Sequence, residues 1–276
     1  MNRLSIAFTR RCGKDHRTCR KDCTFATEKA LIPFITGGFP SMAVSETLIT
    51  TAAEAGANMI IIGVPFSDPV AESPIIQKAE EQALANGCNV DKIFEMAKRV
   101  HYKVQIPLLL NVYANLVFVY GTNKFLDNCI QSGIEGLFIP DLPFEEREEF
   151  AAACKKRAVQ LISGIVPTDD DRLAKITSGA DGFFQCTVGN EITSQTIPAI
   201  ADLVAKIKQL KNLPCAVNFD FITAEQAKQV ATAADGIIVS GQIVQILEQN
   251  GQNEQTAQQA VAKYLQSLRD AIDFSG

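Results

Sequence analysis

The sequence predicts a single-domain (β/α)8 TIM barrel, a member of the α/β fold class. From Leu31 onward, short apolar runs alternate with amphipathic stretches, and each apolar run ends in a cluster of Gly, Pro, Asp or Asn. Eight such runs in about 250 residues fit a closed barrel of parallel strands. The turn Thr36-Gly37-Gly38-Phe39-Pro40 does not match the G-x-G-x-x-G pattern, so an open doubly wound sheet is disfavoured.

Each predicted strand is a short apolar run that is bounded by turn residues. In chain order the eight strands are Leu31–Thr36, Met59–Gly63, Pro107–Val112, Gly136–Ile139, Gln160–Ile165, Gly182–Thr187, Pro214–Asn218 and Gly236–Val239. Helical patterns such as Met42–Ala55 and Ala224–Ala233 separate them, and an amphipathic helix over Thr256–Ile272 is expected to close the outer ring. Chemistry in such a barrel is expected in the loops that follow the strands.

The first 29 residues differ from the rest of the chain. We predict an arm over residues 1–29, with disorder expected, ahead of a barrel over residues 30–276. The arm is basic and contains Cys12, His16, Cys19 and Cys23, four potential zinc ligands within twelve residues. Their C-x3-H-x2-C-x3-C spacing is not that of a standard zinc site, so no metal site is predicted and zinc stays the less favoured alternative.

Composition restricts the classes of partner. The 276 residues are 47% hydrophobic and 21% charged, with a net charge of −5, which lacks the basic excess that nucleic-acid binding requires. No apolar run approaches the roughly 20 residues that span a bilayer, and charges stand where a signal peptide needs apolar residues. We therefore expect a cytoplasmic protein with reduced cysteines, and neither nucleic acid nor membrane as a partner.

Four sequence blocks follow the first four strands in a characteristic order: Leu31–Gly38, Pro65–Pro69, Tyr113–Phe118 and Ile139–Pro143. This order resembles the tryptophan synthase alpha chain family, over about Ala30 to Ile272. The resemblance implies a retro-aldol cleavage of indole-3-glycerol phosphate into indole and glyceraldehyde 3-phosphate. It also implies a pyridoxal-phosphate beta chain as partner, and no cofactor in this chain itself.

The resemblance also implies the site residues. The second of the family's two catalytic carboxylates corresponds to Glu72, whereas the first corresponds to Ile61, which cannot titrate. Losing a positioned general acid or base typically lowers the rate by roughly 10² to 10⁴. The implied substrate-binding residues come from the loops and strand ends of the barrel: Phe34, Tyr113, Thr193, Asn218, Asp220, Ser240 and Gly241.

The loops that hold the substrate phosphate in the family are altered here. The sixth reads Glu191-Ile192-Thr193-Ser194, the seventh Asn218-Phe219-Asp220-Phe221 and the eighth Ser240-Gly241-Gln242, with fewer of the glycines that let a backbone approach a phosphate. A carboxylate at Asp220 about 5 Å from a phosphate would repel it by roughly 6 kcal/mol at an effective dielectric of about 20. Gln185 also replaces a tyrosine of the family pocket.

The blocks that match the family well are those that face or communicate with the beta chain. We predict a partner surface at Pro65, Asp68, Asn115 and Asp141, although such residues in loops also serve turns. The favoured hypothesis is an alpha-type protein with lost or much reduced lyase activity and a retained beta-chain partner. Two alternatives stay open: an active lyase that uses Glu72 with a rearranged phosphate site, and a barrel enzyme redirected to a non-phosphorylated substrate, anchored by Asp220, Glu191 and Glu72.

Overall fold

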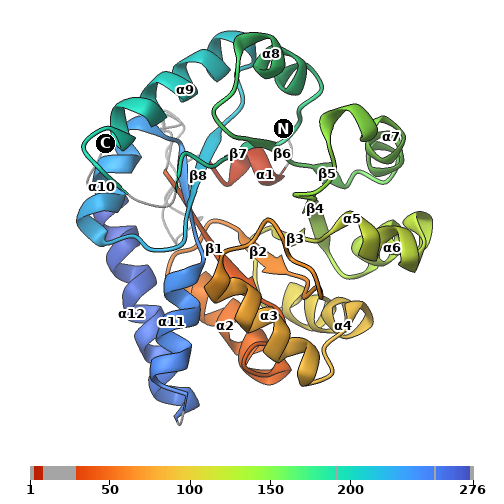
Figure 1. Ribbon diagram of the computed structural model, residues 1–276. Helices are drawn as coiled ribbons and strands as arrows, with labels where there is room; N and C mark the ends of the chain where they lie inside the picture. Colours follow the sequence, from red (N-terminus) through yellow and green to blue (C-terminus); the bar gives the residue numbers. More distant parts are fainter. Residues whose placement is uncertain (1–2, 9–28, 190–191, 252, 274–276) are drawn as a thin grey trace, which may run out of the picture.

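The strands of the computed structural model form one parallel barrel, as predicted (Figure 1). The structure describes residues 3–8, 29–189, 192–251 and 253–273. The predicted strand Gln160–Ile165 divides at Ile162 into β5, which pairs with β4, and β6, which pairs with β7, so the two halves together close the ring. The strands are β1 (Ala30–Thr36), β2 (Ile60–Gly63), β3 (Leu108–Asn111), β4 (Ile134–Phe138), β5 (Gln160–Leu161), β6 (Ser163–Ile165), β7 (Phe184–Cys186), β8 (Cys215–Phe219) and β9 (Gly236–Val239).

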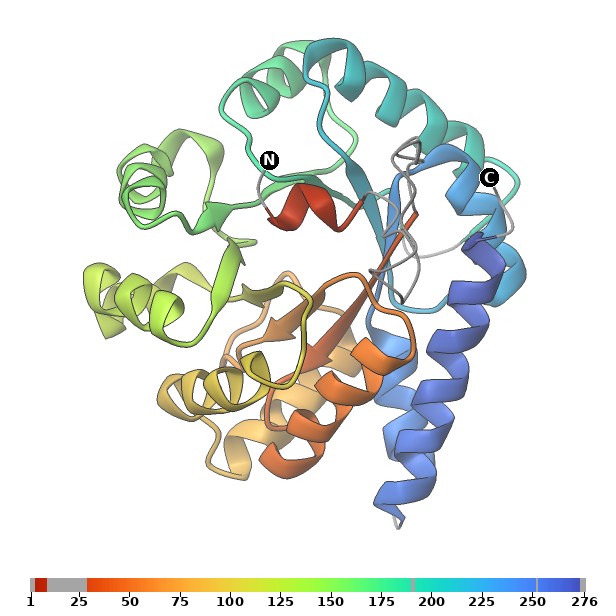
Figure 2. The ribbon, with the colours of Figure 1, turned by 180° about the vertical axis from the view of Figure 1, so that it is seen from behind.

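Helices surround the strands and cover their outer face (Figures 1 and 2). The predicted terminal helix is α12, which packs against α2, α10 and α11 and so joins the end of the outer ring to its beginning. The helices are α1 (Arg3–Ile6), α2 (Met42–Glu54), α3 (Pro74–Ala85), α4 (Val90–His101), α5 (Ala114–Tyr120), α6 (Thr122–Gln131), η1 (Phe144–Glu146), α7 (Glu148–Lys156), α8 (Asp170–Ser178), α9 (Thr196–Leu210), α10 (Ala224–Ala233), α11 (Gly241–Gln249) and α12 (Glu254–Asp273).

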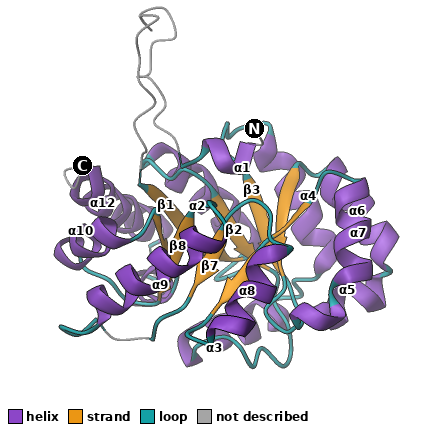
Figure 3. Ribbon diagram, turned by 90° about the horizontal axis from the view of Figure 1, so that it is seen from above, coloured by secondary structure: helices purple, strands orange, loops and turns teal. Residues whose placement is uncertain are grey.

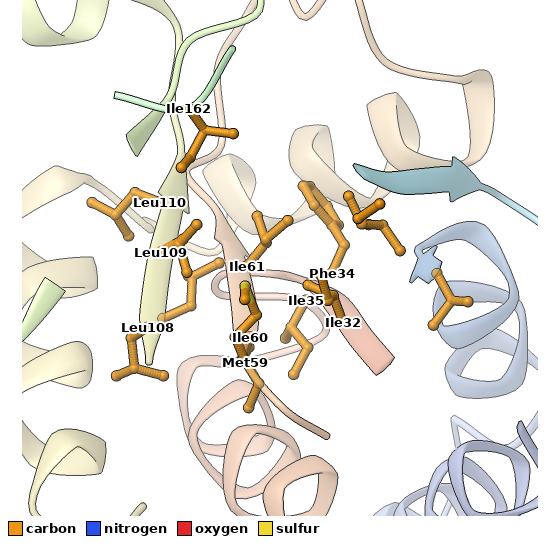
Figure 4. Close-up of a cluster of buried hydrophobic side chains, with 14 of the residues drawn as sticks. Ile32, Phe34, Ile35, Met59, Ile60, Ile61, Leu108, Leu109, Leu110 and Ile162 are labelled. Atoms are coloured by element: carbon orange, nitrogen blue, oxygen red, sulfur yellow. The ribbon is translucent and has the colours of Figure 1, made fainter. Parts of the chain in front are cut away.

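The barrel interior is built from the apolar runs that predicted the strands. Parallel pairing sets Phe34 of β1 beside Ile61 of β2, and Ile61 beside Leu109 of β3. Figure 4 shows these side chains gathered between neighbouring strands. Because side chains of a strand alternate between its two faces, this register decides which residues face the interior and which face the helices.

Helix α1 covers the end of the barrel where the strands begin. Leu4 lies close to Gly136 of β4, Phe8 lies close to Gly236 of β9, and both side chains are buried. Phe8 also contacts Phe183, with 5.4 Å between the ring centroids. In the side view of Figure 3, α1 lies at the top of the barrel and α3 at the bottom. Residues 3–8 are thus part of the packed barrel, at the end opposite the loops that follow the strands.

The predicted arm over residues 1–29 is mostly outside the described residues. Cys12, His16, Cys19 and Cys23 all lie among residues 9–28, which the structure does not describe, so disorder of that segment and the zinc alternative stay predictions. Within the described ranges, no helix combines the length and the apolar character needed to cross a bilayer.

Candidate active site

A cavity of about 620 Å³ opens where the strands end. It extends from the barrel interior toward helices α7 and α8, and polar residues at several strand ends line it. Five of the predicted substrate-binding and catalytic residues line it: Phe34, Glu72, Asn218, Asp220 and Ser240. Ile61 lines it as well, and its volume lies in the range of small-molecule sites, roughly 300 to 1,000 Å³.

Ile61 places a hydrocarbon wall where the family has its first carboxylate. Its side chain is 1% exposed and lies between Phe34 and Leu109 of the neighbouring strands (Figure 4). An isoleucine cannot exchange a proton, and its packed side chain fills space that a water molecule would need. This part of the cavity therefore offers shape and an apolar surface.

Glu72 is a carboxylate of the loop that follows β2, and it lines the cavity. Its Oε1 accepts a hydrogen bond from Nδ2 of Asn111 at 2.7 Å. Burial raises the pKa of Glu72 above its ordinary value; the hydrogen bond from Asn111 opposes this rise, and the negative charge of Asp220 adds to it. A carboxyl group with a raised pKa can act as a proton donor or acceptor closer to neutral pH than an ordinary glutamate.

Asp220 occupies the space beside the start of α11. Its Oδ1 accepts a hydrogen bond from Oγ of Ser240 at 2.8 Å, and a Cβ on Gly241 would lie 3.0 Å from its own Cβ. A helix N-terminus favours negative charge because its first N–H groups lack intrahelical partners. In this chain a carboxylate of the protein already stands at that position.

The remaining predicted residues do not line the cavity. Tyr113 is buried behind the β2 loop, where its hydroxyl accepts a hydrogen bond from the Ala71 N–H at 2.9 Å and its ring stacks on Phe66. Thr193 is exposed, and the hydroxyl of Thr196 accepts a hydrogen bond from its N–H near the start of α9. Gly241 is the first residue of α11. Asn190 and Glu191 of the same loop as Thr193 lie outside the described residues.

Sequence reasoning missed Asn111, although a signal was present. It is the polar residue that ends the otherwise apolar strand Leu108–Asn111, at the barrel end that carries the site. Its amide orients Glu72, and only the structure shows this because the two residues are 39 positions apart.

Glu80 is a second group that the sequence analysis did not single out. It lies on the buried face of α3, is 1% exposed, and accepts a hydrogen bond from the Phe66 N–H at 3.2 Å. Burial raises the pKa of Glu80 to about 8, partly offset by that hydrogen bond, and the charge of Glu72 adds to the rise. Glu80 therefore holds the β2 loop from behind and does not line the cavity.

Two arginines lie on the far wall of the cavity. Arg147 donates to Oγ of Ser163 at 2.7 Å and to the Gly179 carbonyl at 2.8 Å, and Arg172 pairs with Glu145. The cavity is thus acidic near β2, β3 and β8, and basic near α7 and α8. Charge on the two walls is separated rather than mixed.

Comparison with known proteins shows that the chain is similar to tryptophan synthase alpha chains. The profile of the family described as Tryptophan synthase alpha chain matches residues 21–273. The chain is 34% identical over 244 residues to the tryptophan synthase alpha chain of Alkaliphilus metalliredigens, covering 87% of this chain and 91% of that protein. It is 36% identical over 250 residues to that of Geobacter sulfurreducens, covering 89% and 94%.

Solved structures of tryptophan synthase chains have the same fold as this chain. The tryptophan synthase subunit alpha of Legionella pneumophila superposes with a TM-score of 0.83 at 31% identity, covering 89% of this chain and 93% of that one. A chain of tryptophan synthase from M. tuberculosis superposes with a TM-score of 0.79 at 27% identity, covering 89% and 93%. The similarity therefore extends over nearly the whole barrel in both sequence and structure.

Proposed function

Because this chain belongs to the tryptophan synthase alpha chain family, we propose that it is an alpha-type protein with lost or much reduced lyase activity that still binds a beta chain. The observation that carries the proposal is Ile61. The family's retro-aldol needs one group to protonate the indole ring carbon and a carboxylate to stabilise charge at the indole nitrogen. Here a buried aliphatic side chain stands at the first of these positions.

Glu72 supports at most half of that chemistry. One carboxyl group holds one proton, and the 2.7 Å hydrogen bond from Asn111 orients it from the β3 side. Without the first acid or base, the expected loss in rate is roughly 10² to 10⁴. The alternative of an active lyase would require Glu72 to perform both proton transfer and charge stabilisation.

The start of α11 supports the same proposal. A phosphate at this helix N-terminus would meet the Asp220 carboxylate, which already accepts a hydrogen bond from Ser240. At a separation of about 5 Å, a phosphate and a carboxylate repel each other by several kcal/mol at an effective dielectric of about 20. Weak binding of a phosphate ester and a missing proton donor act together against turnover.

The surface around the β2 loop and α5 supports a retained partner. Asp68, Asn115 and Asp141 are exposed, whereas Pro65 is buried and sits beneath this surface. Asp141 also accepts a hydrogen bond from the Ala114 N–H at 2.9 Å, which fixes the start of α5. The large apolar side chains that α5 and the loop expose are Val70, Phe118 and Val119.

We give the name α5 face to these exposed residues of the β2 loop and α5: Asp68, Val70, Asn115, Phe118 and Val119. The Ala71 to Tyr113 hydrogen bond ties the β2 loop to the residue that precedes α5. Exposed apolar side chains gathered beside polar ones are typical of interaction sites. A cytoplasmic location, where a beta chain would be met, stays a prediction.

The test of the proposed function is the release of indole from indole-3-glycerol phosphate, measured for the purified chain alone and with a tryptophan synthase beta chain from the same organism. We expect turnover at least about 10²-fold below that of an ordinary alpha chain in both conditions. We also expect the chain to change the rate at which the beta chain joins indole to serine. Turnover within tenfold of an ordinary alpha chain would refute the loss of activity.

The partner surface has its own variant. Phe118→Asp should weaken beta-chain binding at least tenfold in titration calorimetry, because a charge replaces a side chain that is 56% exposed on the α5 face. Leu210→Asp is the matched control, since Leu210 is 50% exposed at the end of α9, away from this face. If both variants bind the beta chain as the unmodified chain does, the α5 face is not the contact surface.

A further inference from the structure

We propose that the cavity binds, on its α7 and α8 side, a small molecule that carries one carboxylate, held by Arg147, with an apolar body beside Leu142 and Ile176. This site goes beyond the proposed function, which concerns a lost reaction and a protein partner. Neither the loss of lyase activity nor beta-chain binding requires an anion on this side of the cavity.

Arg147 is a buried cation that has no carboxylate partner among the residues that the structure describes. It precedes α7 and lines the cavity, and 9% of its surface is exposed. Its two hydrogen bonds, to Oγ of Ser163 and to the carbonyl of Gly179, have neutral acceptors. Burial lowers the pKa of Arg147 below its ordinary value, and no negative charge of the described residues opposes this. Because buried charges in proteins are as a rule paired, the unmatched charge of Arg147 points to an anion from outside the chain.

The guanidinium group of Arg147 keeps donors for such an anion. A guanidinium group has five N–H donors, and the hydrogen bonds to Ser163 and Gly179 use two of them. Nε of Arg147 is not among the buried side-chain nitrogens that lack a partner in the described part of the chain, so it is open to the cavity that Arg147 lines. The ring of Phe144 lies 4.5 Å from Cζ and supports the group from one face. A guanidinium group that is held in place and keeps free N–H donors matches the planar geometry of a carboxylate.

The count of charges favours a ligand with one negative charge. Arg172, the second arginine on this side of the cavity, already pairs with Glu145, so the charge of Arg147 alone is left unmatched there. A phosphate ester would bring roughly two negative charges into a cavity whose other wall holds Glu72 and Asp220. A carboxylate neutralises Arg147 and adds no excess of negative charge.

Apolar residues near Arg147 define the body of the ligand. Leu142 and Phe144 precede Arg147 in the segment between β4 and α7, and Ile176 lies one turn after Arg172 on α8. All three apolar residues line the cavity, whose volume of about 620 Å³ is sufficient for a small aromatic body. The site therefore suits an aryl or alkyl carboxylate.

Four probes with the same phenylpropyl body and different charge test the proposal: phenylpropionate, phenylpropionamide, phenylpropylamine and phenylpropyl phosphate. Titration calorimetry with the full chain at neutral pH should give phenylpropionate an affinity at least tenfold above that of the amide. The amine and the phosphate should both bind more weakly than phenylpropionate. The proposal would be overturned by an amide or a phosphate that binds as tightly as phenylpropionate, and by absence of phenylpropionate binding at millimolar concentration.

A variant of Arg147 locates the carboxylate. Arg147→Gln should lower phenylpropionate affinity tenfold or more and leave phenylpropionamide affinity unchanged, with circular dichroism to verify the fold. Lys156→Gln is the matched control, because it removes one positive charge at an exposed position in the last turn of α7, outside the cavity wall. Retained phenylpropionate affinity in Arg147→Gln would overturn the proposal, whatever the outcome of the indole-release assay.

A second variant leaves the buried arginine in place. Glu145→Gln removes the carboxylate that pairs with Arg172, and the fold should tolerate it because the Glu145 side chain is 54% exposed. Glu145 lies two residues before Arg147, so phenylpropionate affinity should rise at least twofold at low ionic strength while phenylpropionamide affinity stays the same. Unchanged or lower phenylpropionate affinity in Glu145→Gln would overturn the proposal even if Arg147→Gln does not fold.

Discussion

Ile61→Glu combined with Asp220→Gly is expected to raise the cleavage of indole-3-glycerol phosphate by at least roughly 10²-fold over the unmodified chain. The side chain at position 61 lines the cavity, so the introduced carboxylate faces the substrate space. The second change removes the negative charge beside the start of α11 and leaves a glycine backbone that a phosphate can approach. Steady-state release of indole, measured with the beta chain present, gives kcat/KM for each variant.

The two changes should act together rather than independently. Phosphate binding without a proton donor gives no chemistry, and a proton donor without bound substrate gives little, so the double variant should exceed the product of the single effects. Ile61→Gln with Asp220→Gly is the matched control, because glutamine has the shape of glutamate and cannot transfer the proton. Full activity in either single variant, or in the glutamine control, would contradict this account of the site.

Glu80→Gln is expected to make the free energy of unfolding of the protein markedly less dependent on pH. Burial raises the pKa of Glu80 to about 8, so between the ordinary glutamate pKa and pH 8 the folded state binds more protons than the unfolded state. The free energy of unfolding of the unmodified chain should therefore fall as the pH rises through this window. The contribution is fully present below the ordinary pKa and lost above the raised one, and is of order 4 kcal/mol.

Glutamine keeps an oxygen that accepts from the Phe66 N–H, and it does not titrate. The stability of Glu80→Gln relative to the unmodified chain should thus increase steadily from pH 5 to pH 8, measured by urea unfolding at each pH. Glu81→Gln, at the next and exposed position of α3, should track the unmodified chain throughout. A constant difference between Glu80→Gln and the unmodified chain across this range would show that Glu80 titrates normally in the folded protein.

The strands were predictable because each one is a local apolar run. Gly236–Val239 is predicted and observed with the same bounds, and Ala224–Ala233 likewise among the helices. The break at Ile162 was not predictable, because the division between β5 and β6 depends on which neighbour each half pairs with. Helix α1 was also missed, since four residues give too short a pattern and the burial of its Leu4 arises from a contact with β4.

The candidate site was predictable only where the family motif named its residues. Phe34, Glu72, Asn218, Asp220 and Ser240 do meet at one cavity, whereas Tyr113, Thr193 and Gly241 lie outside its wall. Asn111, Glu80 and Arg147 carry much of the polar structure in and behind the cavity. A local signal exists for Asn111 alone, as the polar end of an apolar strand, and the hydrogen bonds of all three join residues that are 14 to 39 positions apart along the chain.

The amino-acid sequence by itself determined the family, the barrel class and the absence of a titratable group at Ile61, because each of these follows from residue identity and local order. Only the tertiary structure decided that Asp220 stands at the start of α11, that Asn111 turns one half of its amide to Glu72 and leaves the other free, and that Glu80 is buried behind the loop. The physical reason is that hydrogen bonds and charge interactions depend on distances of a few ångströms, which chain folding sets between residues far apart in sequence.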